Sequence, residues 1–148
     1  MNIQEFISQY SNHPVLFVGT GLSLRYLKNS YSWDNLLKKI TFELSGNNES
    51  YLDIKSKCRI SDDKFNYQKI ASSIEEIFNT YLEQNRDGKF KHINDIFYEK
   101  MSKNIYLSRF KIYISQIFSK LEYREELSDE LKEFKKVGKN ISSVITIN

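Results

Sequence analysis

The residues best suited to chemistry form a glycine-containing segment directly after an apolar run. Val15 to Val18 is continuously apolar between Pro14 and Gly19, which is typical of a strand buried on both faces of a parallel sheet. We predict that a turn follows this strand and continues as a loop to about Ser32; the turn residues are Gly19, Thr20, Gly21, Leu22 and Ser23. Such a turn exposes backbone N–H groups that a pyrophosphate can approach.

By itself this glycine pattern is a weak indication, because a Gly-x-Gly after a strand is at least as often only a tight connection. Leu24 occupies the third glycine position of the ordinary dinucleotide fingerprint, and Glu43 lies in a predicted helix rather than at the end of a second strand. The glycine-rich, lysine-containing loop of nucleotide triphosphatases is absent. For Ser23, a role as a helix or turn cap is the alternative to a ligand contact.

The elements that would position this segment follow from apolar periodicity. A first amphipathic helix, which ends before Pro14, is predicted by Ile3, Phe6, Ile7 and Tyr10. A second helix runs from about Trp33 to Leu44 with Ser32 as its N-cap, and Ser45 to Asn48 end it. This helix is expected to bury Trp33, Leu36, Leu37 and Ile40, with Trp33 as a core anchor rather than a ligand contact.

From Asp62 to about Lys136 the pattern predicts helix almost throughout. Three apolar stripes are expected to face a core: Ile70, Ile74, Ile77, Phe78 and Tyr81; Phe90, Ile93, Phe97 and Met101; and Phe110, Ile114, Ile117, Phe118 and Leu121. A last polar helix covers about 124–136, Gly138 breaks it, and a second strand is predicted over 141–147. A two-stranded parallel sheet is rarely a whole design, so more strands are expected beyond Asn148.

Composition narrows the class of protein. The 148 residues are 40% hydrophobic and carry a formal charge of only +3, with 22 basic and 19 acidic residues interspersed. This is a globular composition without the basic block of a nucleic-acid tail. A single cysteine, Cys58, excludes an intrachain disulfide and a cysteine-based zinc site. No signal peptide or membrane-length apolar run is present, so we expect a soluble, cytoplasmic protein without membrane contact.

The two ends of the chain together resemble a known family. Leu16 to Ser23 followed by Ser32 to Leu37 resembles the opening of the divergent bacterial sirtuin-like NAD-binding domains, in which an apolar strand runs into Gly-Ala/Thr-Gly-x-Ser and a Trp-x-x-Leu-Leu helix follows. Ser143 to Asn148 resembles the strand leading into the family's Thr-Thr-Asn-Tyr-Asp motif, with Ile147 in place of the second threonine. The resemblance covers the first strand, the helix after it and the last strand.

The resemblance implies an α/β fold, an incomplete Rossmann-like parallel sheet with a large helical insertion. The whole chain would be the N-terminal portion of one domain, with strand, glycine loop and helix in 1–44, the insertion in 60–137 and a second strand in 141–148. Gly19, Thr20, Gly21, Leu22 and Ser23 would bind NAD, and Asn148 would act beside the nicotinamide ribose. NAD would be the substrate, without a metal ion, and would be cleaved to ADP-ribose and nicotinamide in anti-phage defence.

The chain also departs from the family. It lacks the two cysteine pairs of zinc-binding sirtuins and the Pro-Asp-Phe-Arg segment after their glycine loop, which argues against a lysine deacylase. The family's general-base histidine follows the asparagine motif, so neither His13 nor His92 matches it; both are expected to be surface or packing residues. We therefore expect residues 1–148 alone to be inactive. For Asn148 the alternative is a frayed terminal residue.

Besides NAD, the resemblance implies a homo-oligomer or other defence-system subunits as protein partners, and no direct nucleic-acid binding. The alternative from a different class is a non-catalytic module that binds NAD or ADP-ribose, or a helical protein-interaction domain with a degenerate turn.

Overall fold

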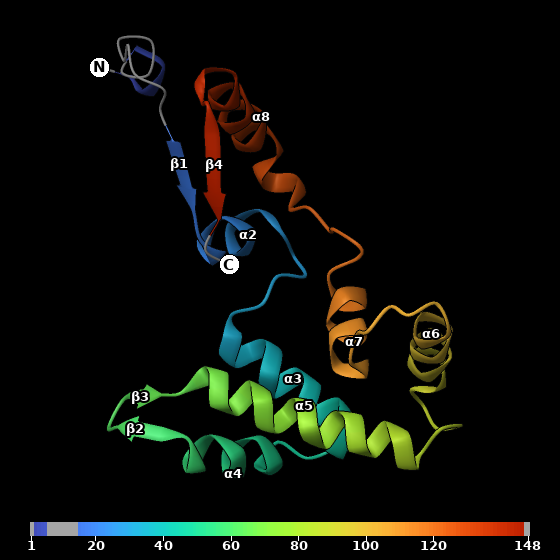
Figure 1. Ribbon diagram of the computed structural model, residues 1–148. Coiled ribbons are helices and arrows are strands. Elements are labelled where there is room, and N and C mark those ends of the chain that lie inside the picture. Colours follow the sequence, from blue (N-terminus) through green and yellow to red (C-terminus); the bar gives the residue numbers. More distant parts are fainter. Residues whose placement is uncertain (1, 6–14, 147–148) are drawn as a thin grey trace. The chain divides into compact units, whose positions relative to one another are not determined.

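The computed structural model describes residues 2–5 and 15–146, and helices dominate it, with 64% of these described residues helical (Figure 1). The chain forms two compact units. One, the terminal unit, combines residues up to Ser30 with residues from Leu121 onward; the other, the central unit, is Tyr31–Lys120. Only Ile3–Glu5 of the predicted first helix falls within the described residues, and these three residues are helical.

The terminal unit is organised by two parallel strands from distant parts of the chain. β1 (Val15–Val18) pairs with β4 (Ser143–Thr146) in a continuous register from Val15 opposite Ser143 to Val18 opposite Thr146 (Figure 1). The predicted parallel pairing is therefore confirmed. The other elements of the unit are α2 (Thr20–Tyr26), the 3-10 turn η1 (Glu125–Leu127), α8 (Ser128–Val137) and the 3-10 turn η2 (Gly138–Asn140).

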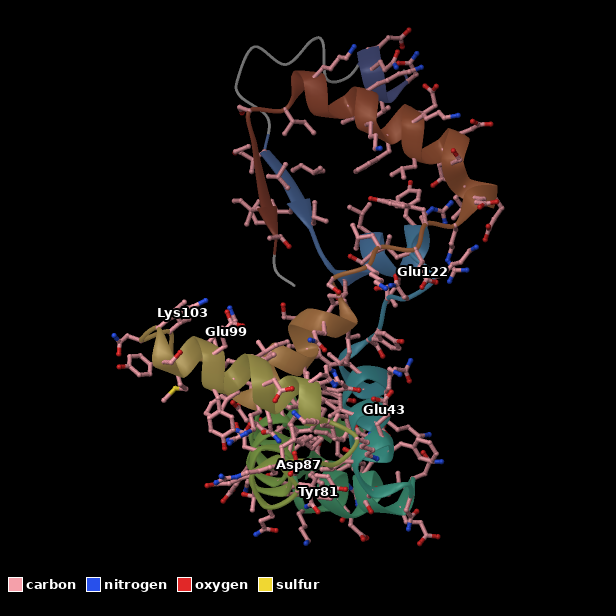
Figure 2. All side chains as sticks on the ribbon, turned by 90° about the vertical axis from the view of Figure 1, so that its right-hand side faces the viewer. Glu43, Tyr81, Asp87, Glu99, Lys103 and Glu122 are labelled. Atoms are coloured by element: carbon pink, nitrogen blue, oxygen red, sulfur yellow. The ribbon has the colours of Figure 1, made fainter. Side chains whose placement is uncertain are left out.

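The prediction that β1 is buried on both faces is wrong. Phe17 is 68% exposed, and Val144 on the partner strand is 59% exposed; Figure 2 shows side chains projecting from both strands. Apolar composition predicts a strand, but its burial depends on covering layers, and a two-stranded sheet provides few neighbours.

The two segments that connect the terminal unit to the central unit are held together. Leu27 and Tyr123 form an antiparallel bridge. The amide N–H of Lys28 donates to the carbonyl of Glu122 at 2.8 Å, and that of Arg124 donates to the carbonyl of Tyr26 at 2.9 Å. The chain therefore leaves the terminal unit and returns to it along adjacent, paired backbone.

The central unit contains five helices and a small hairpin within the described residues. Its elements are α3 (Trp33–Ser45), α4 (Glu49–Lys57), β2 (Arg59–Ser61), β3 (Lys64–Phe65), α5 (Tyr67–Gln84), α6 (Lys91–Ser102) and α7 (Arg109–Ile117). α4 and the β2–β3 hairpin were not predicted, and non-helical residues separate α5, α6 and α7. The several helices expected over about 62–136 are present, and the β3 strand at Lys64–Phe65 is the part of that range that was not expected.

Local signals explain the boundaries of α3. The Ser32 hydroxyl accepts from the Asn35 amide at 3.3 Å, which confirms the predicted N-cap. Gly46 ends the helix with a φ of 71°, a left-handed conformation that glycine adopts at little cost. Trp33, by contrast, is 54% exposed, so its assignment as a core anchor is wrong. It occupies the first turn of α3, and the buried residues of the helix begin only at Leu36.

Helix α5 lies at the centre of the buried apolar core of the central unit. Ile70, Ile74 and Phe78 are essentially inaccessible to solvent and contact apolar residues of the surrounding helices. The Phe78 ring stacks on Tyr113 with centroids 5.1 Å apart and lies edge-on to Phe110 at 5.9 Å. All three predicted stripes are buried only in part, since Ile77 in the first, Met101 in the second, and Phe118 and Leu121 in the third are exposed.

A polar cluster joins α3, α4 and α5. One carboxylate oxygen of Asp34 accepts from the Tyr51 hydroxyl at 2.9 Å, from the Tyr67 hydroxyl at 3.2 Å, and from the Lys55 ammonium. The ammonium also lies 4.6 Å from the centroid of Phe65. Partial burial would raise the pKa of Asp34, but the hydrogen bonds from Lys55 and Tyr51 lower it overall.

A matched pair of substitutions on α5 tests this account of the core. Ile74 is 1% exposed and Ile77 is 47% exposed, one turn apart on the same helix. We expect Ile74→Ala to lower the free energy of unfolding by about 2–5 kcal/mol, because it removes buried methyl groups and leaves a cavity. Ile77→Ala should cost less than about 1 kcal/mol. Urea denaturation measures both, and equal costs would contradict the assignment of the buried face.

Candidate functional site

The glycine segment lies at the end of β1 where β1 and β4 finish together. Gly19 is the N-cap of α2, in an extended conformation, and the Leu22 amide donates to the Gly19 carbonyl at 3.2 Å. Thr20, Gly21, Leu22 and Ser23 all belong to α2. The predicted turn with a loop to Ser32 is therefore wrong, since a seven-residue helix occupies 20–26.

Side-chain packing explains why α2 forms despite its glycine. Leu22 is half-buried and Tyr26, one turn later, is 7% exposed, so the helix has a buried side. The Tyr26 ring lies 6.2 Å from that of Phe134 on α8. Ser23 uses its carbonyl to accept the Leu27 amide at 2.9 Å, which closes the last turn.

Gly21 is exposed and meets no steric demand from the protein. A Cβ atom added at position 21 would have nothing within 4 Å, and Gly21 is not among the described residues with positive φ. The fold would therefore accept a larger residue there. The backbone around Gly21 stays uncovered, which is the property that a main-chain phosphate contact requires.

Sequence reasoning missed the ionic contact that fixes α2 in place. Arg25 donates from Nε and Nη2 to the two carboxylate oxygens of Glu130 on α8, at 2.5 Å and 2.6 Å, and the Tyr26 hydroxyl donates to the same carboxylate at 2.7 Å. Arg25 and Glu130 are 105 residues apart, so no local pattern could have revealed the pair. The bidentate geometry restricts how α2, and with it the glycine segment, can rotate.

This contact shifts the pKa values of the residues that form it. The hydrogen bonds from Arg25 and Tyr26 lower the pKa of Glu130 from its ordinary 4.5 to about 2. The same carboxylate raises the pKa of Arg25 and that of Tyr26. A surface hollow of about 410 Å³ lies beside this cluster, lined among others by Tyr26, Glu130 and Phe134, and none of Gly19–Ser23 lines it.

The other candidate residues are less informative. Asn148 and His13 lie outside the described residues, so the role of Asn148 stays a prediction. His92 is exposed on α6, as expected for a surface histidine, and its Nε2 lies 3.0 Å from the side-chain oxygen of Gln116. Across residues 2–5 and 15–146 no three His, Cys, Asp or Glu side chains gather closely enough to hold a metal ion. No helix in that same part of the chain is long and apolar enough to cross a membrane.

Comparisons of the chain with models of known families, with characterised proteins and with solved structures returned no match. The interpretation of the glycine segment therefore rests on its residues and on the geometry above.

The Arg25–Glu130 contact makes a pH-dependent prediction. Because the pKa of Glu130 is lower in the folded state, its contribution to stability is complete above pH 4.5 and is lost as the pH falls towards 2. We expect an NMR titration of the Glu130 carboxyl to give a pKa near 2, which Arg25→Gln shifts upward towards 4.5. Arg124→Gln, the same change elsewhere in the terminal unit, should leave it near 2. If the pKa of Glu130 were the same in Arg25→Gln as in the parent protein, the contact would not persist in solution.

Proposed function

We propose that the chain is the NAD-binding portion of a sirtuin-like NAD hydrolase used in anti-phage defence. The observation that carries the proposal is the parallel β1–β4 pair, with a glycine connection at the edge where both strands end. Open parallel sheets bind nucleotides outside the carboxyl ends of their strands. Gly19, Thr20, Gly21, Leu22 and Ser23 would then contact the pyrophosphate and adjoining ribose.

The steric freedom at Gly21 supports this assignment. Because a Cβ at that position would meet only open space, the protein's own packing does not explain a glycine there. A ligand that approaches the main chain closely would explain it. The residues present therefore fit an NAD pyrophosphate, and the Arg25–Glu130 contact would hold the helix that carries them.

In the proposed reaction the bond between nicotinamide and ribose breaks through an oxocarbenium-like transition state, and water takes the place of nicotinamide. Binding of the remote pyrophosphate by the glycine segment would orient the reacting ribose. Asn148, following the resemblance, would hold a ribose hydroxyl or the attacking water. A general-base histidine from outside residues 1–148 would accept the proton.

Two glycines of the terminal unit allow a matched test in the complete protein. Gly21 and Gly138 both have open space where a Cβ would stand. We expect Gly21→Val to weaken NAD binding at least about tenfold, because a branched side chain would block a close main-chain contact. Gly138→Val should bind NAD normally. Calorimetric titration measures binding, and thermal unfolding should show both variants as stable as the parent, since glycine is a poor helix residue.

Nicotinamide release separates the proposed enzyme from its alternative. The complete protein should cleave NAD, and Asn148→Ala should lower the rate strongly at little cost in stability. NAD binding without release would instead establish the non-catalytic module. If Gly21→Val and Gly138→Val bind NAD equally, the glycine segment is only a connection and the proposed site is wrong.

A further inference from the structure

Helix α7 of the central unit begins with an arginine that is buried among neutral groups. Arg109 is 8% exposed, and its Nε donates to the side-chain oxygen of Asn94 at 2.7 Å. Its Nη2 donates to the Tyr98 hydroxyl at 3.2 Å, and the guanidinium carbon lies 3.9 Å from the centroid of Phe97. An amide, a phenol and aromatic rings solvate the cation, but none of them neutralises its charge.

The carboxylates nearest in sequence on α6 are paired elsewhere. Asp95 pairs with Lys91 at 3.0 Å, and Glu99 pairs with Lys103 at 2.6 Å; Figure 2 shows Glu99 and Lys103 close together at the end of α6. Glu75 accepts from the hydroxyl of Ser108, the residue before Arg109, at 2.6 Å. Among the described residues no carboxylate forms an ion pair with Arg109. Burial of an uncompensated cation is costly, and an anion from outside the protein would offset that cost.

A second guanidinium group, that of Arg86, also lies near the ring of Tyr98. The guanidinium carbon of Arg86 is 5.8 Å from the centroid of Tyr98, and that of Arg109 is 5.5 Å from it. Arg86 is exposed and uses only Nε, in a 3.3 Å hydrogen bond to the Glu83 carbonyl. Among the described residues no carboxylate forms an ion pair with Arg86 either. Both terminal nitrogens of Arg86 are therefore available to a ligand.

A single buried amide organises both arginines. Asn94 is 2% exposed; its oxygen accepts from Arg109, while its nitrogen donates to the backbone carbonyls of Leu82 at 2.9 Å and Arg86 at 3.1 Å. The same side chain therefore orients the Arg109 guanidinium and fixes the backbone that carries Arg86.

We propose that Arg86, Tyr98 and Arg109 form a binding site for the phosphate group of a small molecule. Guanidinium groups match phosphate oxygens in shape and charge, and the Tyr98 hydroxyl, which already accepts from Arg109, can donate its own proton to a third oxygen. Tyr98 is 43% exposed, and its ring would offer an apolar surface beside the phosphate. A small ligand fits better than a nucleic acid, because Lys91 and Lys103, at the two ends of α6, are each paired with a carboxylate.

Inorganic pyrophosphate is a suitable probe, titrated calorimetrically into the full chain at constant ionic strength. We expect saturable binding, weakened at least about tenfold by Arg86→Gln because a charged contact is lost, and weakened several-fold by Tyr98→Phe. Arg59→Gln is the matched control: it removes the same charge from the β2–β3 hairpin of the same unit and should leave binding unchanged. Arg86 is exposed, so Arg86→Gln does not threaten the fold.

Three results would overturn the proposal. The first is no saturable binding of pyrophosphate at millimolar concentration. The second is equal weakening by Arg59→Gln and Arg86→Gln, which would indicate diffuse attraction to positive charge. The third is binding that survives Arg86→Gln and Tyr98→Phe but is lost in Gly21→Val, which would assign the pyrophosphate to the glycine segment instead.

Discussion

The parallel pairing of β1 with β4 is the constraint on which the terminal unit depends. Parallel neighbours cannot be joined by a tight turn, so the chain between them must return to the end at which it started. Here the return includes an entire second unit, and the paired backbone at Leu27–Lys28 and Glu122–Arg124 holds the two connections together. An insertion whose ends are adjacent disturbs its host little, which explains how 90 residues can separate two halves of one unit.

The elements that sequence reasoning predicted are those whose signal is local and repeated. α3 was found with its N-cap at Ser32 and its end within Ser45 to Asn48, and α5 was found from the spacing of Ile70, Ile74 and Phe78. α4 was missed because Glu49–Lys57 has little apolar periodicity, and Tyr51 is its only buried residue. α2 was missed because its first turn contains a glycine, and contacts to a helix more than a hundred residues later stabilise it.

Burial and site geometry were harder to predict, because both depend on contacts between segments that are far apart in the sequence. Trp33 and Phe17 are apolar residues in correctly predicted elements, yet both are exposed, because burial depends on which other elements lie opposite. The positions of the glycines follow from sequence, and the parallel pairing follows from the spacing of strands and helices. The Arg25–Glu130 contact and the Asn94–Arg109 contact join residues on different helices, so nothing in a single segment indicates them.

The two units differ in what stabilises them, and this difference bears on function. The buried apolar cluster, from Leu36 to Tyr113, lies wholly within the central unit. In the terminal unit, β1 and β4 are joined by their parallel pairing. α2 is joined to α8 by the Glu130 carboxylate, which accepts hydrogen bonds from Arg25 and Tyr26. Segments with few buried contacts open more readily than packed cores, and ligand sites are drawn from such segments. The contacts of Glu130 with Arg25 and Tyr26, rather than a large buried core, therefore set the position of the helix that carries Gly21.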